Sequence, residues 1–276
     1  MKVELINSLV YQNFAGIKWQ IEQVANGHSD ELWLATPHED AVSLIEAHHI
    51  APEKVFDVYR QQYLTEIDVS KGIWWSDLSV PNDAQIVVNQ DWTSSVVSLG
   101  SELAQVKWFP QSTRIVQAVS WLDADGKLDY KDIYHRDGTL FARQFFSEGD
   151  LLESDFYQTT GELSTVDYYF NGARNFVVHG QSQFSSADTY LLDVMSSFPE
   201  VTFDITQLGR ELDFAPDNTQ LTMPAGVIDD QGQIYPNLIQ ILTNNQHKIK
   251  RVIVSKDDYQ RLIKAGYASN KLEKMS

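Results

Sequence analysis

Residues 121–172 read WLDADGKLDYKDIYHRDGTLFARQFFSEGDLLESDFYQTTGELSTVDYYFNG, and they carry the clearest structural pattern in the sequence. Glycine closes five turn signals, at steps of 12, 11, 12 and 11 residues: Asp125-Gly126, Asp137-Gly138, Glu148-Gly149, Thr160-Gly161 and Asn171-Gly172. A glycine between runs of β-branched and aromatic residues predicts a tight hairpin, because such turns need positive φ. The even spacing therefore predicts an antiparallel β-meander with strands at 115–122, 128–135, 140–146, 151–157, 163–170 and 174–179.

Aromatic residues crowd this predicted meander. Alternation places Leu128, Tyr130, Asp132 and Tyr134 on one face and the residues between them on the other. Neither face is fully apolar, and part of the aromatic set is expected to stay accessible as a binding platform. The alternative is that these rings only pack against one another or against the rest of the chain. The candidate partner-binding or acceptor-binding residues are Trp121, Tyr130, Tyr134, Phe141, Phe145, Tyr157 and Tyr168.

An α/β pattern lies on both sides of the meander. Residues 1–59 alternate strand and helix, and Thr36-Pro37-His38-Glu39 predicts a capping box for a helix that reaches about His48. Residues 60–181 are interpreted as the inserted antiparallel domain, with irregular strands up to about residue 110. Residues 182–276 return to α/β, and no further lobe is expected after Gly266. The fold class is thus α/β, Rossmann-like, with an inserted all-antiparallel β-meander.

Composition narrows the possible partners. The 276 residues hold 21 Lys and Arg against 38 Asp and Glu, for a net charge of −17. This balance argues against a nucleic-acid groove, which needs clustered cations, and leaves at most a peripheral association with a membrane. The chain has no cysteine, which excludes disulfides and thiolate metal sites. We therefore expect a cytoplasmic protein.

No motif for catalysis or cofactor binding stands out. The sequence lacks Gly-x-Gly-x-x-Gly, a phosphate-binding loop and a Gly-x-Ser-x-Gly elbow. The seven histidines show no metal-ligand spacing, and the paired acidic residues fall mostly at predicted turns or helix starts. We expect no catalytic residue, no metal and no cofactor in this chain, which by itself is expected to lack enzymatic activity.

Two runs carry a family resemblance: Val119 to Leu128 (VSWLDADGKL) and Tyr134 to Ala142 (YHRDGTLFA). They resemble the β-meander of bacterial accessory Sec glycosyltransferases. These enzymes attach O-linked GlcNAc to serine-rich repeat adhesins in the cytoplasm of Gram-positive bacteria. The opening Tyr11-Gln12-Asn13 and the close, Leu238 to Leu242 followed by Lys250 to Val254, resemble the non-catalytic subunit of that two-protein enzyme.

The resemblance implies the first Rossmann-like lobe of a GT-B glycosyltransferase, with the meander inserted. It implies a non-catalytic stabilising subunit, or chaperone, that recognises the adhesin and holds a catalytic glycosyltransferase subunit, which would use UDP-GlcNAc. Because similar meanders occur in teichoic-acid glycosyltransferases, the alternative is the acceptor-binding lobe of a competent enzyme, truncated before its donor-binding lobe. A structural scaffold that dimerises through the meander is a further alternative.

Overall fold

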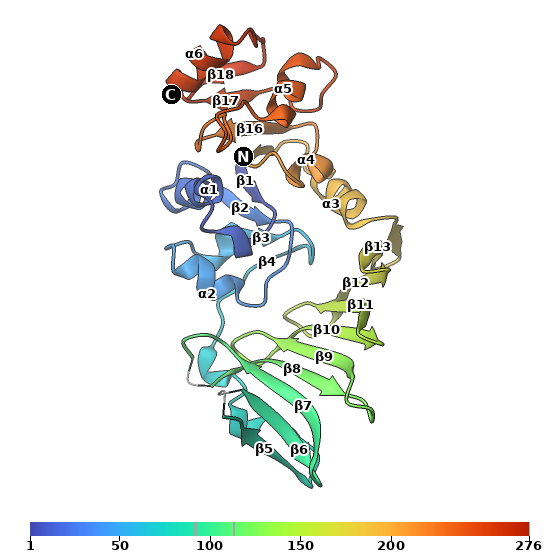
Figure 1. Cartoon of the computed structure of the whole chain (residues 1–276). Coiled ribbons are helices and arrows are strands. Elements are labelled where there is room, and N and C mark those ends of the chain that lie inside the picture. Colours follow the sequence, from blue (N-terminus) through green and yellow to red (C-terminus); the bar gives the residue numbers. More distant parts are fainter. Residues whose placement is uncertain (91–92, 113, 276) are drawn as a thin grey trace. The chain divides into compact units, whose positions relative to one another are not determined.

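The computed structural model describes residues 1–90, 93–112 and 114–275. Two compact units make up the chain (Figure 1). Unit 1 combines Met1–Leu64 with Leu191–Ser276, and unit 2 is Thr65–Tyr190. Unit 2 is therefore inserted, in sequence, between the two parts of unit 1.

Unit 1 is built on an eight-stranded sheet in the order β18-β17-β16-β15-β1-β2-β3-β4. All neighbours are parallel except β3 and β4. The chain runs from β1 outward to one side and later from β15 outward to the other, which makes a doubly wound sheet. The strands are β1 (Lys2–Ile6), β2 (Glu31–Leu34), β3 (Val55–Asp57), β4 (Gln62–Tyr63), β15 (Thr202–Ile205), β16 (Thr219–Met223), β17 (Val252–Val254) and β18 (Leu272–Lys274).

Helices connect these strands, and their apolar residues form the core of the unit. Ile17 and Ile21 of α1 are buried, as are Val3 and Leu5 of β1. The helices are α1 (Ala15–Ala25), α2 (Ala41–Glu46), α4 (Glu211–Phe214), α5 (Pro236–Thr243) and α6 (Lys256–Lys264), with α3 (Ala187–Ser196) at the junction with unit 2. Short 3₁₀ turns are η1 (Leu9–Tyr11) and η2 (Pro52–Lys54) in unit 1, and η3 (Val69–Lys71) and η4 (Trp75–Asp77) in unit 2. No helix in the described part of the chain is long and apolar enough to cross a membrane.

The predicted capping box at Thr36 is wrong. Helix α2 begins at Ala41 with Asp40 at its N-cap and ends at Glu46, two residues before His48. The Thr36 hydroxyl donates instead to Asn7 Oδ1 at 3.2 Å, next to the end of β1. The Thr36 hydroxyl therefore bonds to a residue distant in sequence, instead of to the nearby backbone N–H that a capping box requires. By contrast, Ser255 caps α6 locally, because its hydroxyl accepts from Asp258 N.

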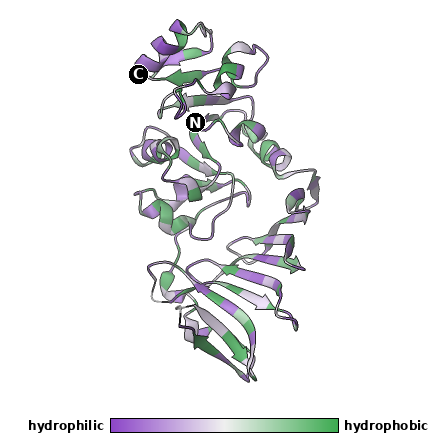
Figure 2. Ribbon diagram, in the orientation of Figure 1, coloured by the Kyte–Doolittle hydropathy of each residue, from purple (hydrophilic) through white to green (hydrophobic). Residues whose placement is uncertain are grey.

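Unit 2 is a ten-stranded antiparallel sheet in which every strand pairs with its neighbours in sequence. Its strands carry alternating hydrophilic and hydrophobic stretches (Figure 2). The strands are β5 (Ala84–Val88), β6 (Ser94–Ser98), β7 (Ser101–Trp108), β8 (Val116–Leu122), β9 (Leu128–Tyr134), β10 (Leu140–Ser147), β11 (Asp150–Tyr157), β12 (Leu163–Phe170), β13 (Ala173–His179) and β14 (Ser182–Phe184). The predicted meander is thereby confirmed, and its six strands agree with the structure to within one residue at each end.

The turn glycines adopt the expected conformation. Gly126, Gly138, Gly149, Gly161 and Gly172 all have φ between 72° and 89°. Two of the turns also place the preceding residue at positive φ, at Glu148 and Asn171. The sheet extends further than the glycine period indicates, because β5 to β7 and β14 add to it. In unit 1, strand β18 forms after Gly266 and pairs with β17 at one edge of the sheet.

Candidate functional site

One cross-strand row, mostly of aromatic side chains, runs across six of the ten strands of the unit 2 sheet. The register pairs Trp121 with Tyr130, Tyr130 with Phe145, Phe145 with Glu153, Glu153 with Tyr168 and Tyr168 with Phe176. Directly opposed residues of neighbouring strands lie on the same face of a sheet. Strands β8 to β13 therefore present an aromatic row, interrupted only by Glu153, on a surface that we call the tyrosine face. The aromatic row is Trp121, Tyr130, Phe145, Tyr168 and Phe176.

The rings of this row contact one another along the sheet. Trp121 and Tyr130 are stacked with their centroids 6.0 Å apart, and Tyr168 and Phe176 lie 6.2 Å apart. Phe145 remains 36% exposed and Tyr168 remains 40% exposed. Exposed rings at this density are typical of a surface that binds a partner, because each ring offers apolar area at a low cost in side-chain entropy.

A charged group lies beside the aromatic row on the same face. Arg143 pairs in register with Asp132 on one side and Asp155 on the other. Its Nε lies 2.6 Å from Asp132 Oδ1, and its guanidinium is 5.4 Å from the centre of the Tyr130 ring. Within the described residues, Asp155 Oδ1 is buried and has no hydrogen-bond partner. The tyrosine face thus offers a cation, ring faces and an unfilled acceptor within a few strands.

Tyr134 and Tyr157 complete this group. Burial, and then the charge of Asp132, raises the pKa of Tyr134 to about 12. Burial also raises the pKa of Tyr157, with Asp155 as the next cause, and Tyr157 Oη lies 3.5 Å from Asp155 Oδ2. Both hydroxyls stay protonated at neutral pH and can donate hydrogen bonds. The arrangement suits recognition of polar groups rather than nucleophilic chemistry.

The opposite face carries different chemistry. Its central cross-strand row contains no aromatic residue from β6 to β12: Ser95, Gln105, Ser120, Lys131, Gln144, Ser154 and Asp167. Gln144 Nε2 donates to Ser154 Oγ at 3.3 Å within this row. The two faces of one sheet therefore differ in character, and the aromatic one is the better candidate for binding.

One end of the tyrosine face is covered by the chain itself. Leu78, with Ile73 and Val80, packs against a cluster that includes Val96, Val106 and Val119. Ile73 O accepts from Val116 N at 2.9 Å, which ties this segment to β8. The cover packs on strands β6 to β8, whereas Phe145 and Tyr168 farther along the sheet stay accessible.

The structure gathers six of the seven predicted site residues on the tyrosine face. Trp121, Tyr130, Phe145 and Tyr168 belong to the aromatic row, and Tyr134 and Tyr157 flank Arg143. Phe141 is placed elsewhere: it is 3% exposed and packs edge-on against Phe156 and His135. The sequence reasoning did not select Arg143, Asp132, Glu153 or Phe176, although the alternation that it noted puts Asp132 beside Tyr130 and Tyr134.

No group of three or more His, Asp or Glu side chains in the described ranges is arranged to hold a metal ion.

Comparison with solved structures identifies the class of fold to which this chain belongs. The chain aligns over its whole length with the GtfA/B complex bound to UDP and GlcNAc, at 14% identity and a TM-score of 0.69. It also aligns over its whole length with the Gap123 glycosylation-associated protein complex from Streptococcus agalactiae, at 11% identity and a TM-score of 0.75. The same holds for the pneumococcal O-GlcNAc transferase GtfA, at 12% identity and a TM-score of 0.74. The fold is that of the first part of a GT-B glycosyltransferase with an inserted antiparallel sheet, as predicted.

The matched chains are longer than this one. The chain spans 61%, 60% and 60% of their respective lengths. The search of curated proteins returned no match. More specifically than the fold, the sequence of residues 85–184 matches the family described as the GtfB middle domain. This region holds the whole aromatic row. The match confirms the predicted resemblance to the accessory Sec glycosylation proteins.

Proposed function

We propose that this chain is part of a GtfB-like, non-catalytic subunit that recognises an unmodified acceptor polypeptide and supports a catalytic glycosyltransferase subunit. The observation that carries the proposal is the match of residues 85–184 to the GtfB middle domain, the region that presents the aromatic row. In the similar GtfA/B complex, GtfA is joined to GtfB, which supports a GtfA-like partner for this chain.

The chemistry of the tyrosine face suits a weakly charged, hydroxyl-rich polypeptide such as a serine-rich repeat. Ring faces at Phe145 and Tyr168 can contact its backbone and small side chains, and the hydroxyl oxygens of Tyr134 and Tyr157, whose protons go to Asp132 and Asp155, can accept hydrogen bonds from its hydroxyls. Asp155 Oδ1 can accept from a serine hydroxyl. Few ion pairs are required, which agrees with an acceptor that has few charges.

A second candidate is the acceptor-binding lobe of an enzyme that is catalytic by itself. The pneumococcal GtfA and TarM, the latter at 12% identity and a TM-score of 0.69, share this fold over the whole chain. This alternative would be favoured if the downstream coding sequence were found to encode a donor-binding lobe with a pair of glutamates that hold the sugar nucleotide.

A paired assay tests the proposal. The chain is immobilised and incubated with unmodified serine-rich repeat polypeptide, and separately with UDP-GlcNAc to follow hydrolysis. We expect retention of the polypeptide and no turnover of the sugar nucleotide. A charged polypeptide of equal length is the control. Equal retention of the control, or release of UDP by the chain alone, contradicts the proposal.

A further inference from the structure

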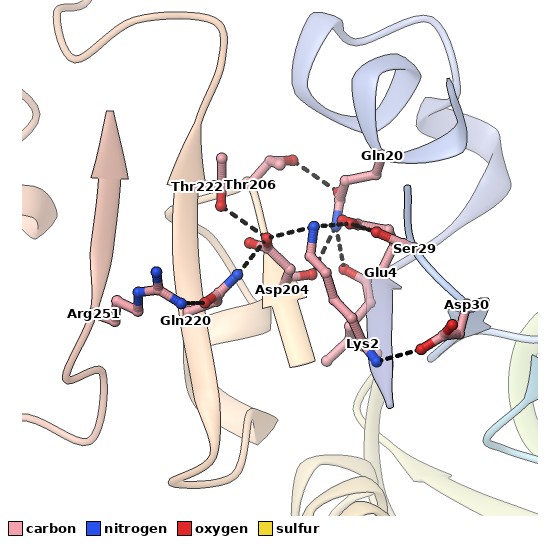
Figure 3. A network of polar contacts seen from close by, with 11 residues as sticks. Lys2, Glu4, Gln20, Ser29, Asp30, Asp204, Thr206, Gln220, Thr222 and Arg251 are labelled. Carbon is pink, nitrogen blue, oxygen red and sulfur yellow. Dashed lines mark hydrogen bonds and ion pairs between the residues drawn. The ribbon is translucent and has the colours of Figure 1, made fainter. Parts of the chain in front are cut away.

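Unit 1 contains a pocket of about 580 Å³ on one face of its parallel sheet. The polar and aromatic residues that line it include Lys2, Trp19, Asp204, Gln220, Thr222 and Arg251. Asp204 comes from β15, and Gln220 and Thr222 come from β16 (Figure 3). Trp19 comes from α1. The pocket extends across the sheet face, from Lys2 at the start of β1 to Lys274 at the end of β18.

A pair of buried carboxylates lies beneath this pocket. Glu4 and Asp204 are register partners on the parallel strands β1 and β15, and their exposed fractions are 0% and 1%. The Lys2 ammonium lies 3.1 Å from Glu4 Oε1 and 3.6 Å from Asp204 Oδ2. Two carboxylates thus share one cation, as Figure 3 shows.

The two oxygens of Asp204 differ in their partners. Gln220 Nε2 and Thr222 Oγ1 donate to Oδ2 at 2.7 and 2.8 Å. Within the described part of the chain, Asp204 Oδ1 and Glu4 Oε2 are both buried without a hydrogen-bond partner, and Asp204 is the one of the two residues that lines the pocket. Since a buried acceptor without a donor is costly, Oδ1 is a built position for a donor that comes from a ligand.

The walls of the pocket supply the complementary groups. Arg251 Nη1 donates to Gln220 Oε1 at 3.1 Å and leaves other guanidinium protons at the rim. The half-buried Trp19 ring lies 5.8 Å from the Lys2 ammonium and offers an apolar surface. Three cations, Lys2, Arg251 and Lys274, line the pocket together with the Asp204 carboxylate, so that the pocket offers hydrogen-bond donors and an acceptor side by side. A hydroxyl group both donates and accepts, and it therefore fits between this floor and this rim.

We propose that this pocket binds a neutral saccharide. One hydroxyl donates to Asp204 Oδ1, a second accepts from Lys2 or Arg251, and the C–H face of the ring lies against Trp19. This site belongs to unit 1 and is independent of the polypeptide recognition proposed for the tyrosine face of unit 2.

Ligand-observed saturation-transfer NMR on the full chain tests the proposal, with glucose and N-acetylglucosamine as separate probes. Glucose 6-phosphate and arginine methyl ester are the anionic and cationic comparisons. We expect at least one neutral sugar to bind with a Kd of about 1–10 mM and more tightly than both charged probes. Asp204→Asn turns the free acceptor into a donor while an oxygen can still accept from Gln220 and Thr222, and we expect it to weaken binding about tenfold or more. Asp257→Asn, on the exposed first turn of α6, should leave binding unchanged.

Trp19→Ala provides a second variant, because its ring is half-exposed and its loss removes the stacking surface without touching the carboxylates. We expect this variant to lose the sugar signal as well. Absence of a signal from both sugars at about 100 mM overturns the proposal. So does tighter binding of either charged probe, or undiminished sugar binding by both Asp204→Asn and Trp19→Ala.

Discussion

Arg143 and Asp132 lie opposite each other on β10 and β9, and Arg143 Nε is 2.6 Å from Asp132 Oδ1. The carboxylate is almost fully buried, whereas the guanidinium is 37% exposed and covers the Tyr130 ring. The ion pair therefore holds a charge under the tyrosine face and orients the cation toward solvent. Three of the candidate binding tyrosines, at positions 130, 134 and 157, have Arg143 among the charges that affect their pKa values.

Replacement of this cation should lower stability. Arg143→Met leaves the Asp132 carboxylate buried without its charged donor, and we expect a loss of about 1–2 kcal/mol, at the low end for a buried unpaired group because the arginine is partly exposed. Urea unfolding followed by circular dichroism measures the change. Lys127→Met removes the exposed partner of Glu148 and should have almost no effect. Equal losses in the two variants would show that the Arg143 pair is no more than a surface contact.

The buried pair in unit 1 predicts a pH dependence. Burial, followed by the charge of Asp204, raises the pKa of Glu4 from 4.5 to about 7. The folded chain therefore binds this proton more tightly than the unfolded chain does. The contribution of Glu4 to stability is greatest below about pH 4.5, falls as the pH rises to about 7, and is constant above that.

Glu4→Gln isolates this contribution, because glutamine resembles the protonated acid and does not titrate. We expect the stability of the natural chain relative to Glu4→Gln to decrease steadily between pH 4.5 and 7. Chemical unfolding at several pH values measures the difference between the two proteins. A difference that stays constant over this range, or that grows with pH, would contradict the predicted shift.

Gly72 occupies a position where the backbone of one segment closely approaches another. A Cβ atom at Gly72 would lie 2.4 Å from the backbone oxygen of Arg136 and 2.8 Å from Ile115 Cγ2. The φ of Gly72 is −56°, so that the effect of a side chain here is steric rather than conformational.

Gly72→Ala should therefore displace the covering segment and destabilise the chain by about 1–3 kcal/mol, the usual cost of overpacking. The matched variant is Gly209→Ala, where the new Cβ would make an ordinary contact at 3.5 Å with Glu211 Oε2. Thermal unfolding of both proteins measures the difference. A Gly72→Ala protein as stable as Gly209→Ala would show that the segment at 69–73 can move without cost.

The sequence predicts the meander well because its turns are local. Each of the five glycines adopts positive φ, and the runs between them are rich in β-branched and aromatic residues, which favour strands. The aromatic row was harder to predict, because it depends on which residues stand opposite one another across six strands. The register shifts at β-bulges, for example between Phe145 and Phe146, and simple alternation cannot locate these shifts.

Phe141 illustrates this limit. Alternation from Arg143 and Phe145 places Phe141 on the tyrosine face, but the β9–β10 register shifts between Leu140 and Ala142. Phe141 packs instead against Phe156, which pairs with Ala142 and Thr165 on the other face. The capping box at Thr36 failed for a related reason, because its partner Asn7 is distant in sequence. The saccharide pocket was also outside the reach of sequence reasoning, since β1 and β15 lie about two hundred residues apart in the chain.

The last prediction concerns acceptor binding and rests on the proposed function. Tyr130→Ala and Tyr168→Ala each remove one ring from the aromatic row, at positions separated by two strands. Removal of a ring from a contact surface costs about 1–2 kcal/mol in affinity, which corresponds to about a 5- to 30-fold higher Kd for the serine-rich polypeptide. Fluorescence anisotropy with a labelled repeat peptide measures this change. Tyr267→Ala, in unit 1, should bind as the natural chain does. Because Tyr130 supports Arg143 whereas Tyr168 is 40% exposed, Tyr168→Ala is the cleaner variant, and unchanged affinity in this variant would count against the tyrosine face as the binding surface.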